Sequence, residues 1–216
     1  MKNYIKEVLL LIITLIPVIV MLKFWSIIPE QMPVHWNSNF EIDGYSSKLK
    51  TFYMILGLNL GLYITLLVAP LIDPKKQNIE LSKKAYFYIR LATTILISII
   101  SLSIVLFSTE FSFEVSSILS IGIPLLFMII GNFLPKMRKN YFIGIRTPWT
   151  LANEEVWKKT HLLGGKIWFF VGLFGVIWGI LAPIDYLNVF IGLVLISTIY
   201  IVIYSYLEFK KLETDK

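Results

Sequence analysis

The chain has 216 residues, of which 56% are hydrophobic and 16% charged, and its formal net charge is +6. Soluble domains are usually about 45–50% apolar and about 25% charged, so this chain has too few charges to build a water-facing surface. The composition excludes a soluble globular enzyme and indicates an integral membrane protein. With no cysteine and only two histidines, disulfide scaffolds and thiolate sites are excluded, and little material remains for a metal centre.

Six apolar runs are long enough to cross about 30 Å of hydrocarbon. They cover residues 8–22 (extending toward 28), 52–72, 85–109, 115–135, 167–184 and 186–207. No small-residue cleavage site follows the first run, so we interpret it as an uncleaved span and not as a signal peptide. The fold class predicted is therefore an all-α integral membrane protein with six transmembrane helices.

Lysine and arginine fall mainly on one side of these spans. Of the 20 basic residues, 17 belong to the side that holds both termini and 3 to the other. Positively charged loops stay in the cytoplasm, so we predict that both termini are cytoplasmic. The excess charge is interpreted as facing anionic lipid, with no direct binding to nucleic acid.

The chain then divides into three parts. Residues 1–72 contain two spans and an outer loop at 29–51, residues 73–135 contain spans three and four, and residues 136–216 contain an inner loop at 136–166 and the last two spans. Recognition is expected in the two long loops, because loops carry specificity while spans carry packing.

The outer loop combines prolines, which favour extended chain, with Asp43–Gly44, a dipeptide typical of a tight turn. It is either a small folded cap on the membrane surface or a recognition surface for an extracellular ligand. The candidate ligand-facing residues are His35, Trp36, Asn37, Asp43, Gly44 and Tyr45. A metal site is not favoured, because zinc normally needs three or four well-placed ligands, and no cofactor is expected.

The inner loop contains a helix start at Thr147–Pro148 and a stop or hinge at Gly164–Gly165. Apolar residues spaced by three and four, together with the ion pairs Glu154–Lys158 and Glu155–Lys159, predict a short interfacial amphipathic helix before the fifth span. Arg146 and His161 mark its ends. Arg146 either faces lipid phosphate, with His161 simply solvated, or both belong to a docking surface for a cytoplasmic partner. No spacing indicates a nucleophile with a positioned base, so catalysis is not expected.

Within the spans, the pairs Gly57–Gly61 and Gly175–Gly179 are GxxxG patterns, which allow helices to approach closely. Hydrogen bonds between spans two and three are predicted for a polar set consisting of Asn59, Ser98, Ser101 and Ser103. No acidic residue lies deep in a span, which disfavours a proton-coupled transporter.

The two loops together resemble a known family. The inner segment, GNFLPKMRKNYFIGIRTPWTLANEEVWKKTHLLGG, is similar to the signature of the SdpI family of bacterial membrane immunity proteins. The outer pattern, P-x-H-W-N followed by D-G-Y, resembles the small domain of unknown function that typically precedes that signature. Phe40 departs from the pattern, which has glycine there. The order and spacing match over essentially the whole chain.

This resemblance implies a multi-pass protein of the bacterial cytoplasmic membrane that protects its host from a secreted toxic peptide of the sporulation-delaying type. It also implies signalling, in which toxin-bound protein sequesters a cytoplasmic transcriptional repressor. Membrane lipids would be further partners. A transporter exporting a peptide or lipid, and a general envelope-stress protein, remain alternatives.

Carried over by matching position, the outer-loop residues named above would face the toxin. The cytoplasmic, partner-binding motif would consist of Asn132, Pro135, Asn140, Tyr141, Gly144, Arg146, Thr147, Pro148, Trp149, Glu154, Trp157, His161, Gly164 and Gly165.

Overall fold

The computed structural model describes residues 2–37, 39–109, 115–181 and 186–214. Six helices are long and apolar enough to cross a membrane, which confirms the predicted six-span, helical fold. These are α1 (Lys2–Lys23), α2 (Lys48–Ile72), α4 (Lys83–Phe107), α5 (Val115–Phe133), α7 (Glu154–Leu181) and α8 (Tyr186–Thr214). The shorter elements are β1 (Gln31–Trp36), β2 (Ile42–Ser47), α3 (Lys76–Leu81), the 3-10 turn η1 (Leu134–Lys136) and α6 (Pro148–Ala152).

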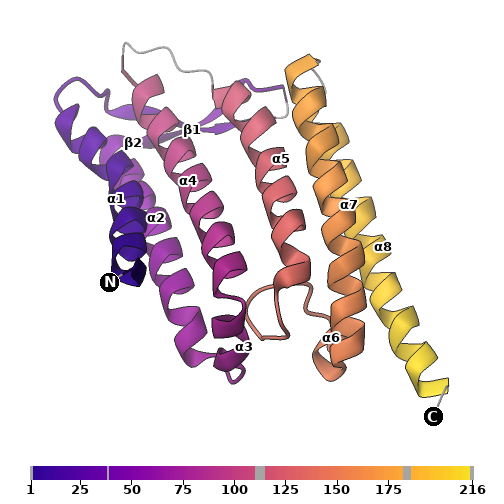
Figure 1. Ribbon diagram of the computed structural model, residues 1–216. Helices are drawn as coiled ribbons and strands as arrows, with labels where there is room; N and C mark the ends of the chain where they lie inside the picture. Colours follow the sequence, from indigo (N-terminus) through magenta and orange to yellow (C-terminus); the bar gives the residue numbers. More distant parts are fainter. Residues whose placement is uncertain (1, 38, 110–114, 182–185, 215–216) are drawn as a thin grey trace.

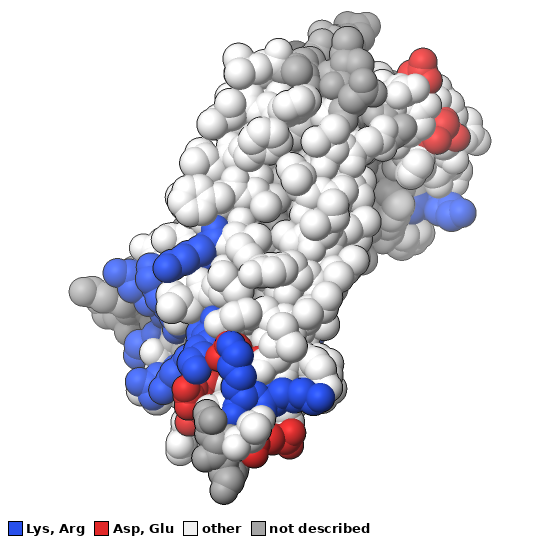
Figure 2. All heavy atoms as spheres, turned by 90° about the vertical axis from the view of Figure 1, so that its right-hand side faces the viewer, with Lys and Arg blue, Asp and Glu red and all other residues white. Residues whose placement is uncertain are grey.

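The long helices stand side by side in two groups of three (Figure 1). Helices α1, α2 and α4 pack together, α4 contacts α5, and α5 packs against α7, which in turn contacts α8. The β1–β2 hairpin covers one end of the first group, and α1 and α8 place both chain ends toward the opposite end. Lysine and arginine gather at that opposite end (Figure 2). We call the two ends the hairpin end and the basic end.

The proline inside α1 leaves a backbone carbonyl without its helical donor, and a side chain of α4 replaces that donor. Pro17 has no N–H, so the carbonyl of Ile13, four residues earlier, loses its helical donor. The Ser98 hydroxyl of α4 lies 3.0 Å from that oxygen and 3.2 Å from Oδ1 of Asn59 in α2. Asn59 Nδ2 in turn donates to Ser101 at 2.8 Å. The interhelical bonds predicted for Asn59, Ser98 and Ser101 are confirmed, and they join three helices.

Helix α4 makes two further polar contacts with its neighbours. Pro70 in α2 frees the carbonyl of Leu66, which accepts the hydroxyl of Tyr86. Arg90, only 6% exposed, donates from Nη1 and Nη2 to the two carboxylate oxygens of Glu7 in α1, at 2.8 and 2.9 Å. Such a two-point pair satisfies both charged groups at once. Arg90 is therefore held by a partner that the sequence did not reveal.

Glycines on α7 allow it to lie directly against α5. They recur every seven residues, at Gly165, Gly172 and Gly179, and a Cβ at Gly172 would lie 2.6 Å from the backbone nitrogen of Met128. The predicted Gly175–Gly179 pair lies in this contact. An added Cβ at either glycine of the Gly57–Gly61 pair would meet no atom within 4 Å, so that pair does not pack helices within the chain.

The glycine contact generates a stability prediction. Gly172→Ala should lower the free energy of unfolding by about 1–3 kcal/mol, because its methyl group would overlap the α5 backbone. Gly57→Ala, the matched control, should leave stability equal or raise it by up to about 1 kcal/mol, because alanine favours helix. Thermal unfolding in detergent, followed by tryptophan fluorescence, measures both. Equal midpoints for the two variants would contradict the packing described.

Candidate functional site

The candidate residues of the outer loop lie close together in a β-hairpin, but the turn of this hairpin is not at the predicted Asp43–Gly44. Strands β1 and β2 pair antiparallel, with His35 opposite Gly44. Asp43 and Gly44 lie within β2, so the turn predicted at that dipeptide is wrong. Gly44 is needed for a different reason, because a Cβ there would lie 2.8 Å from the Cβ of His35.

The chain reverses instead around Asn37, whose side chain organises the turn. Its Oδ1 accepts the backbone N–H groups of Asn39 and Glu41 at 2.9 and 3.0 Å, and its Nδ2 donates to the Glu41 carboxylate at 3.0 Å. Phe40 has a φ of 61°, a left-handed conformation that glycine adopts most easily. The departure at Phe40 therefore falls where the backbone favours glycine, and the turn geometry is kept.

The remaining hairpin residues divide into an anchor and an outward-facing group. The Trp36 ring packs edge-on against Phe107 of α4, with centroids 6.0 Å apart, and contacts the apolar cluster at the hairpin end. His35 Nδ1 and Asp43 Oδ1 lie 2.5 Å apart on the solvent side, and Tyr45 is 62% exposed. An exposed pair of this kind contributes about 0–1 kcal/mol to stability, so His35, Asp43 and Tyr45 are available for contact with a ligand.

Lys48 fastens the hairpin to the helices. Its Nζ donates to the Ile28 carbonyl at 3.0 Å and pairs with Glu30 at 2.9 Å, and the residue is only 9% exposed. Lys48 falls within the predicted outer loop at 29–51, and its position before an apolar span does not show whether the side chain is buried or solvated.

At the basic end, residues 134–153 form a folded segment between α5 and α7, which we call the foot segment. Its centre is Asn140, which is fully buried. The Asn140 side chain donates to the carbonyls of Arg138 and Ile143 at 2.9 and 3.0 Å, and accepts the N–H groups of Phe142 and Ile143 at 2.9 and 2.7 Å. All of its polar atoms are satisfied, so one side chain supports a stretch that has no helix or strand bonds of its own.

His161 supports the same segment from α7. It is 1% exposed, and its Nε2 accepts the N–H of Ile145 at 3.0 Å while Nδ1 lies 2.8 Å from the carbonyl of Trp157. Because Nε2 accepts a hydrogen bond and Nδ1 faces a carbonyl oxygen, the imidazole is the neutral form with its hydrogen on Nδ1. Trp157 stacks on the ring at 3.9 Å and donates to the Met137 carbonyl at 2.8 Å. The interpretation of His161 as simply solvated is therefore wrong.

Gly144 is required beside this histidine. Its φ of 125° lies in a region that side chains rarely adopt, and a Cβ there would collide with the His161 ring. The backbone of the foot segment thus passes close over the imidazole of His161, and only glycine fits at position 144.

The predicted helix start is confirmed. Thr147 caps α6 by accepting the N–H of Thr150 at 3.2 Å, Thr150 accepts the N–H of Thr147 at 2.9 Å, and Pro148 occupies the first helical position. The helix is shorter than expected, however, because α6 ends at Ala152.

A new helix, α7, begins directly afterwards and passes through the predicted stop. Asn153 starts it by accepting the N–H groups of Glu155 and Val156 at 2.7 and 3.2 Å. Gly164 and Gly165 lie inside α7, so the stop or hinge predicted there is wrong. Their lack of side chains instead makes room for Ile145 and Pro135. The predicted amphipathic helix is therefore split between α6 and the first turns of α7.

Side chains from the segment between α2 and α4 hold the foot segment in place. Asp73, which is buried, accepts the N–H of Tyr141 at 2.8 Å. Asn78 donates to the Lys139 carbonyl at 2.7 Å, and Ser82 accepts a backbone N–H of the same stretch at 2.9 Å. These residues could not be identified from the sequence, because they lie about 60 residues from their partners and no local pattern indicates the contact.

An ion-pair cluster connects the ends of α7 and α8. Lys159 lies 3.0 Å from Glu155, which confirms one of the two predicted pairs, and also 3.1 Å from Glu208 of α8. The other predicted pair, Glu154–Lys158, is not formed. Glu208 is buried and pairs further with Lys211 at 2.6 Å. The charges that favoured an interfacial helix therefore also join two spans.

The predicted cytoplasmic motif separates by exposure. Its buried members are Asn140, Thr147, Trp157, His161, Gly164 and Gly165, and its exposed members are Asn132, Pro135, Tyr141, Arg146, Pro148 and Glu154. Gly144 and Trp149 are partly exposed, and the Trp149 ring packs against Tyr206. Arg146 donates to the Tyr141 carbonyl at 2.6 Å. Only the exposed group presents side chains that a partner could contact directly.

The two histidines provide a matched test of this assignment. His161→Ala should lower the free energy of unfolding by about 2–4 kcal/mol, because it orphans the Ile145 N–H and leaves a cavity. His35→Ala should cost no more than about 1 kcal/mol. Thermal unfolding in detergent compares them, and trypsin cleavage after Lys136 and Arg138 reports opening of the foot segment. Unchanged proteolysis of the His161 variant would contradict the supporting role.

Comparisons with known proteins agree with both loop patterns. Residues 136–206 match the SdpI/YfhL protein family, and residues 12–60 match a domain of unknown function, DUF1648. The chain is 26% identical over 211 residues to the immunity protein SdpI of Bacillus subtilis (strain 168). The aligned region covers 98% of this chain and 99% of that protein. No solved structure matches. The resemblance is confirmed in both loops: the carboxyl-terminal part of the chain matches the SdpI/YfhL protein family, and a match to DUF1648 precedes it.

Proposed function

We propose that this multi-pass membrane protein protects a bacterium against a secreted toxic peptide of the sporulation-delaying type. The observation that carries the proposal is the near full-length similarity to a protein named for immunity. The hairpin and the foot segment support it, because each is an ordered polar structure at one end of a bundle that is otherwise apolar.

In this proposal the hairpin end faces outward and the basic end faces the cytoplasm. Lysine and arginine gather at the basic end (Figure 2), and positively charged loops are retained in the cytoplasm. The toxin would then meet the exposed side chains of His35, Asp43 and Tyr45 first. Trp36 would hold the hairpin in position from below.

A relay to a cytoplasmic transcriptional repressor would involve the foot segment. A ligand shifts only those states that it binds differentially, so toxin capture must favour one arrangement of the foot segment over another. The bonds from Asp73 and Asn78 to this segment offer a connection, because both residues follow α2, whose other end begins at the hairpin. The exposed members of the motif, including Tyr141 and Arg146, would contact the repressor.

Survival of a sensitive bacterium that produces this protein tests the proposal. Cells are challenged with a sporulation-delaying-type peptide and, separately, with an unrelated pore-forming peptide. Protection against the first peptide alone supports immunity. Equal protection against both would indicate general envelope tolerance. No protection against either would contradict the proposal and favour transport of a peptide or lipid.

Two exposed tyrosines test where the peptide is captured. Tyr45, on the hairpin, and Tyr53, on the outer surface of α2, are 62% and 63% exposed. Tyr45→Ala should lower the tolerated peptide concentration at least about fivefold, because exposed aromatic side chains often dominate binding, and Tyr53→Ala should lower it less than about twofold. Protein amounts in the membrane are compared by immunoblotting. Loss with Tyr53→Ala alone would place capture on the helices and overturn the hairpin assignment.

The absence of cysteine makes the orientation directly measurable. Single variants Asn39→Cys, in the hairpin, and Arg138→Cys, in the foot segment, each introduce one exposed thiol. In intact cells a membrane-impermeant maleimide should label Asn39→Cys, whereas Arg138→Cys should react only after permeabilisation. The reverse pattern would invert the topology.

A further inference from the structure

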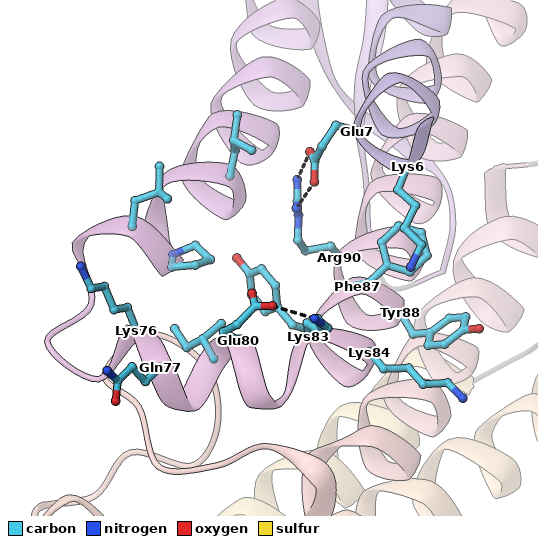
Figure 3. A pocket seen from close by; sticks show the side chains of 15 residues that line it. Lys6, Glu7, Lys76, Gln77, Glu80, Lys83, Lys84, Phe87, Tyr88 and Arg90 are labelled. Atoms are coloured by element: carbon cyan, nitrogen blue, oxygen red, sulfur yellow. Dashed lines mark hydrogen bonds and ion pairs between the residues drawn. The ribbon is translucent and has the colours of Figure 1, made fainter. Parts of the chain in front are cut away.

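A cavity of about 690 Å³ opens at the basic end between α1, α2, α3 and α4 (Figure 3). One part of its lining is apolar and comes mainly from the end of α2, with Leu67, Pro70 and Leu71. The other part is cationic and contains Lys6, Lys76, Lys83, Lys84 and Arg90. The lining of the cavity therefore combines the two chemistries of an amphiphile, apolar and cationic.

The acidic residues of the lining are already neutralised. Glu7 is held by Arg90 at 2.8 and 2.9 Å, and Glu80 pairs with Lys83 at 2.8 Å. Three lysines remain that no described carboxylate pairs with, namely Lys6, Lys76 and Lys84. An anion entering the cavity would thus meet unpaired positive charge and would not need to break an existing ion pair.

Lys6 and Lys76 lie on opposite sides of the lining (Figure 3). The ammonium group of Lys6 lies 4.4 Å from the centre of the Phe87 ring, which keeps it at the cavity wall. Lys76 begins α3 beyond the end of α2. Both side chains are long and flexible, so either ammonium group can turn toward the negative charge of a phosphate diester.

The level of the cavity relative to the bilayer indicates that the phosphate belongs to a lipid. Its apolar half belongs to the last turns of a spanning helix, where Leu71 is 71% exposed, and its lysines lie just beyond. In a bilayer this is the level at which hydrocarbon gives way to headgroups. A soluble anion would gain nothing from the apolar half, whereas a lipid would place its first methylene groups there.

We propose that this cavity is a binding site for an anionic phospholipid, with the phosphate at the unpaired lysines, Lys6 and Lys76 among them, and the acyl chains along Leu67 and Leu71. Basic cavities between membrane helices are a recurring means of binding anionic lipid headgroups. The site is separate from the hairpin and from the foot segment's exposed motif residues, and the proposal goes beyond the immunity function without resting on it.

The test uses the full chain, purified in detergent, and measures lipid retention by native mass spectrometry. The probes are phosphatidylglycerol, phosphatidylcholine, and the free anions inorganic phosphate and glycerol 3-phosphate. The cavity variant is Lys6→Gln with Lys76→Gln. The matched control, Lys158→Gln with Lys210→Gln, removes the same charge from exposed positions outside the cavity lining. Thermal unfolding establishes that both variants are folded.

The wild type and the control should retain phosphatidylglycerol in preference to phosphatidylcholine. The cavity variant should bind it about 30-fold more weakly, because each lysine near an anionic lipid contributes about fivefold in affinity. Equal losses in both variants would show non-specific attraction and overturn the site. Binding of phosphate or glycerol 3-phosphate as tight as that of the lipid would assign the cavity to a soluble anion and overturn the lipid proposal.

Discussion

Hydrocarbon supplies no hydrogen-bond partner, and this constraint governs how the helices of the protein meet. Each proline within a span frees a carbonyl that must be satisfied by protein. Helix α4 provides the donors for two of these carbonyls, through Ser98 and Tyr86, and thereby fixes its contacts with α1 and α2. In the second group the backbone carbonyl freed by Pro124, that of Ser120, faces Gly179 of α7. Pro17 and Pro70 thus mark two places where α4 supplies a hydrogen-bond donor to a neighbouring helix.

The foot segment meets the same constraint without a helix or strand along most of its length. Asn140 and His161 provide side-chain partners for backbone groups that would otherwise be buried alone, and Asp73 adds one from α2. Many residues of the family motif are therefore accounted for by folding. Arg146 and Tyr141 are among the members of the motif that remain at the surface.

The spans and the helix cap at Thr147 could be predicted because hydropathy and capping are local properties of the chain. The hairpin could not, since a strand is defined by its partner, and Asp43–Gly44 looks like a turn until His35 is seen opposite. His161 was misplaced because a stripe on one helix does not show that an irregular segment covers its other side. Ser103 was expected to bond between helices, but its hydroxyl donates to carbonyls of its own helix, which spacing alone does not distinguish.

The contacts of α4 also bear on the order in which the protein is made. Helices α1 and α2 leave the ribosome first, carrying the Glu7 carboxylate and the unpaired carbonyls of Ile13 and Leu66. Every donor that satisfies these three groups belongs to α4, which is complete only at Phe107. The first half of the protein therefore becomes a self-sufficient unit in the bilayer only once α4 has been inserted. Until then, the growing chain depends on water, lipid headgroups or the insertion machinery to accommodate one charge and two backbone oxygens.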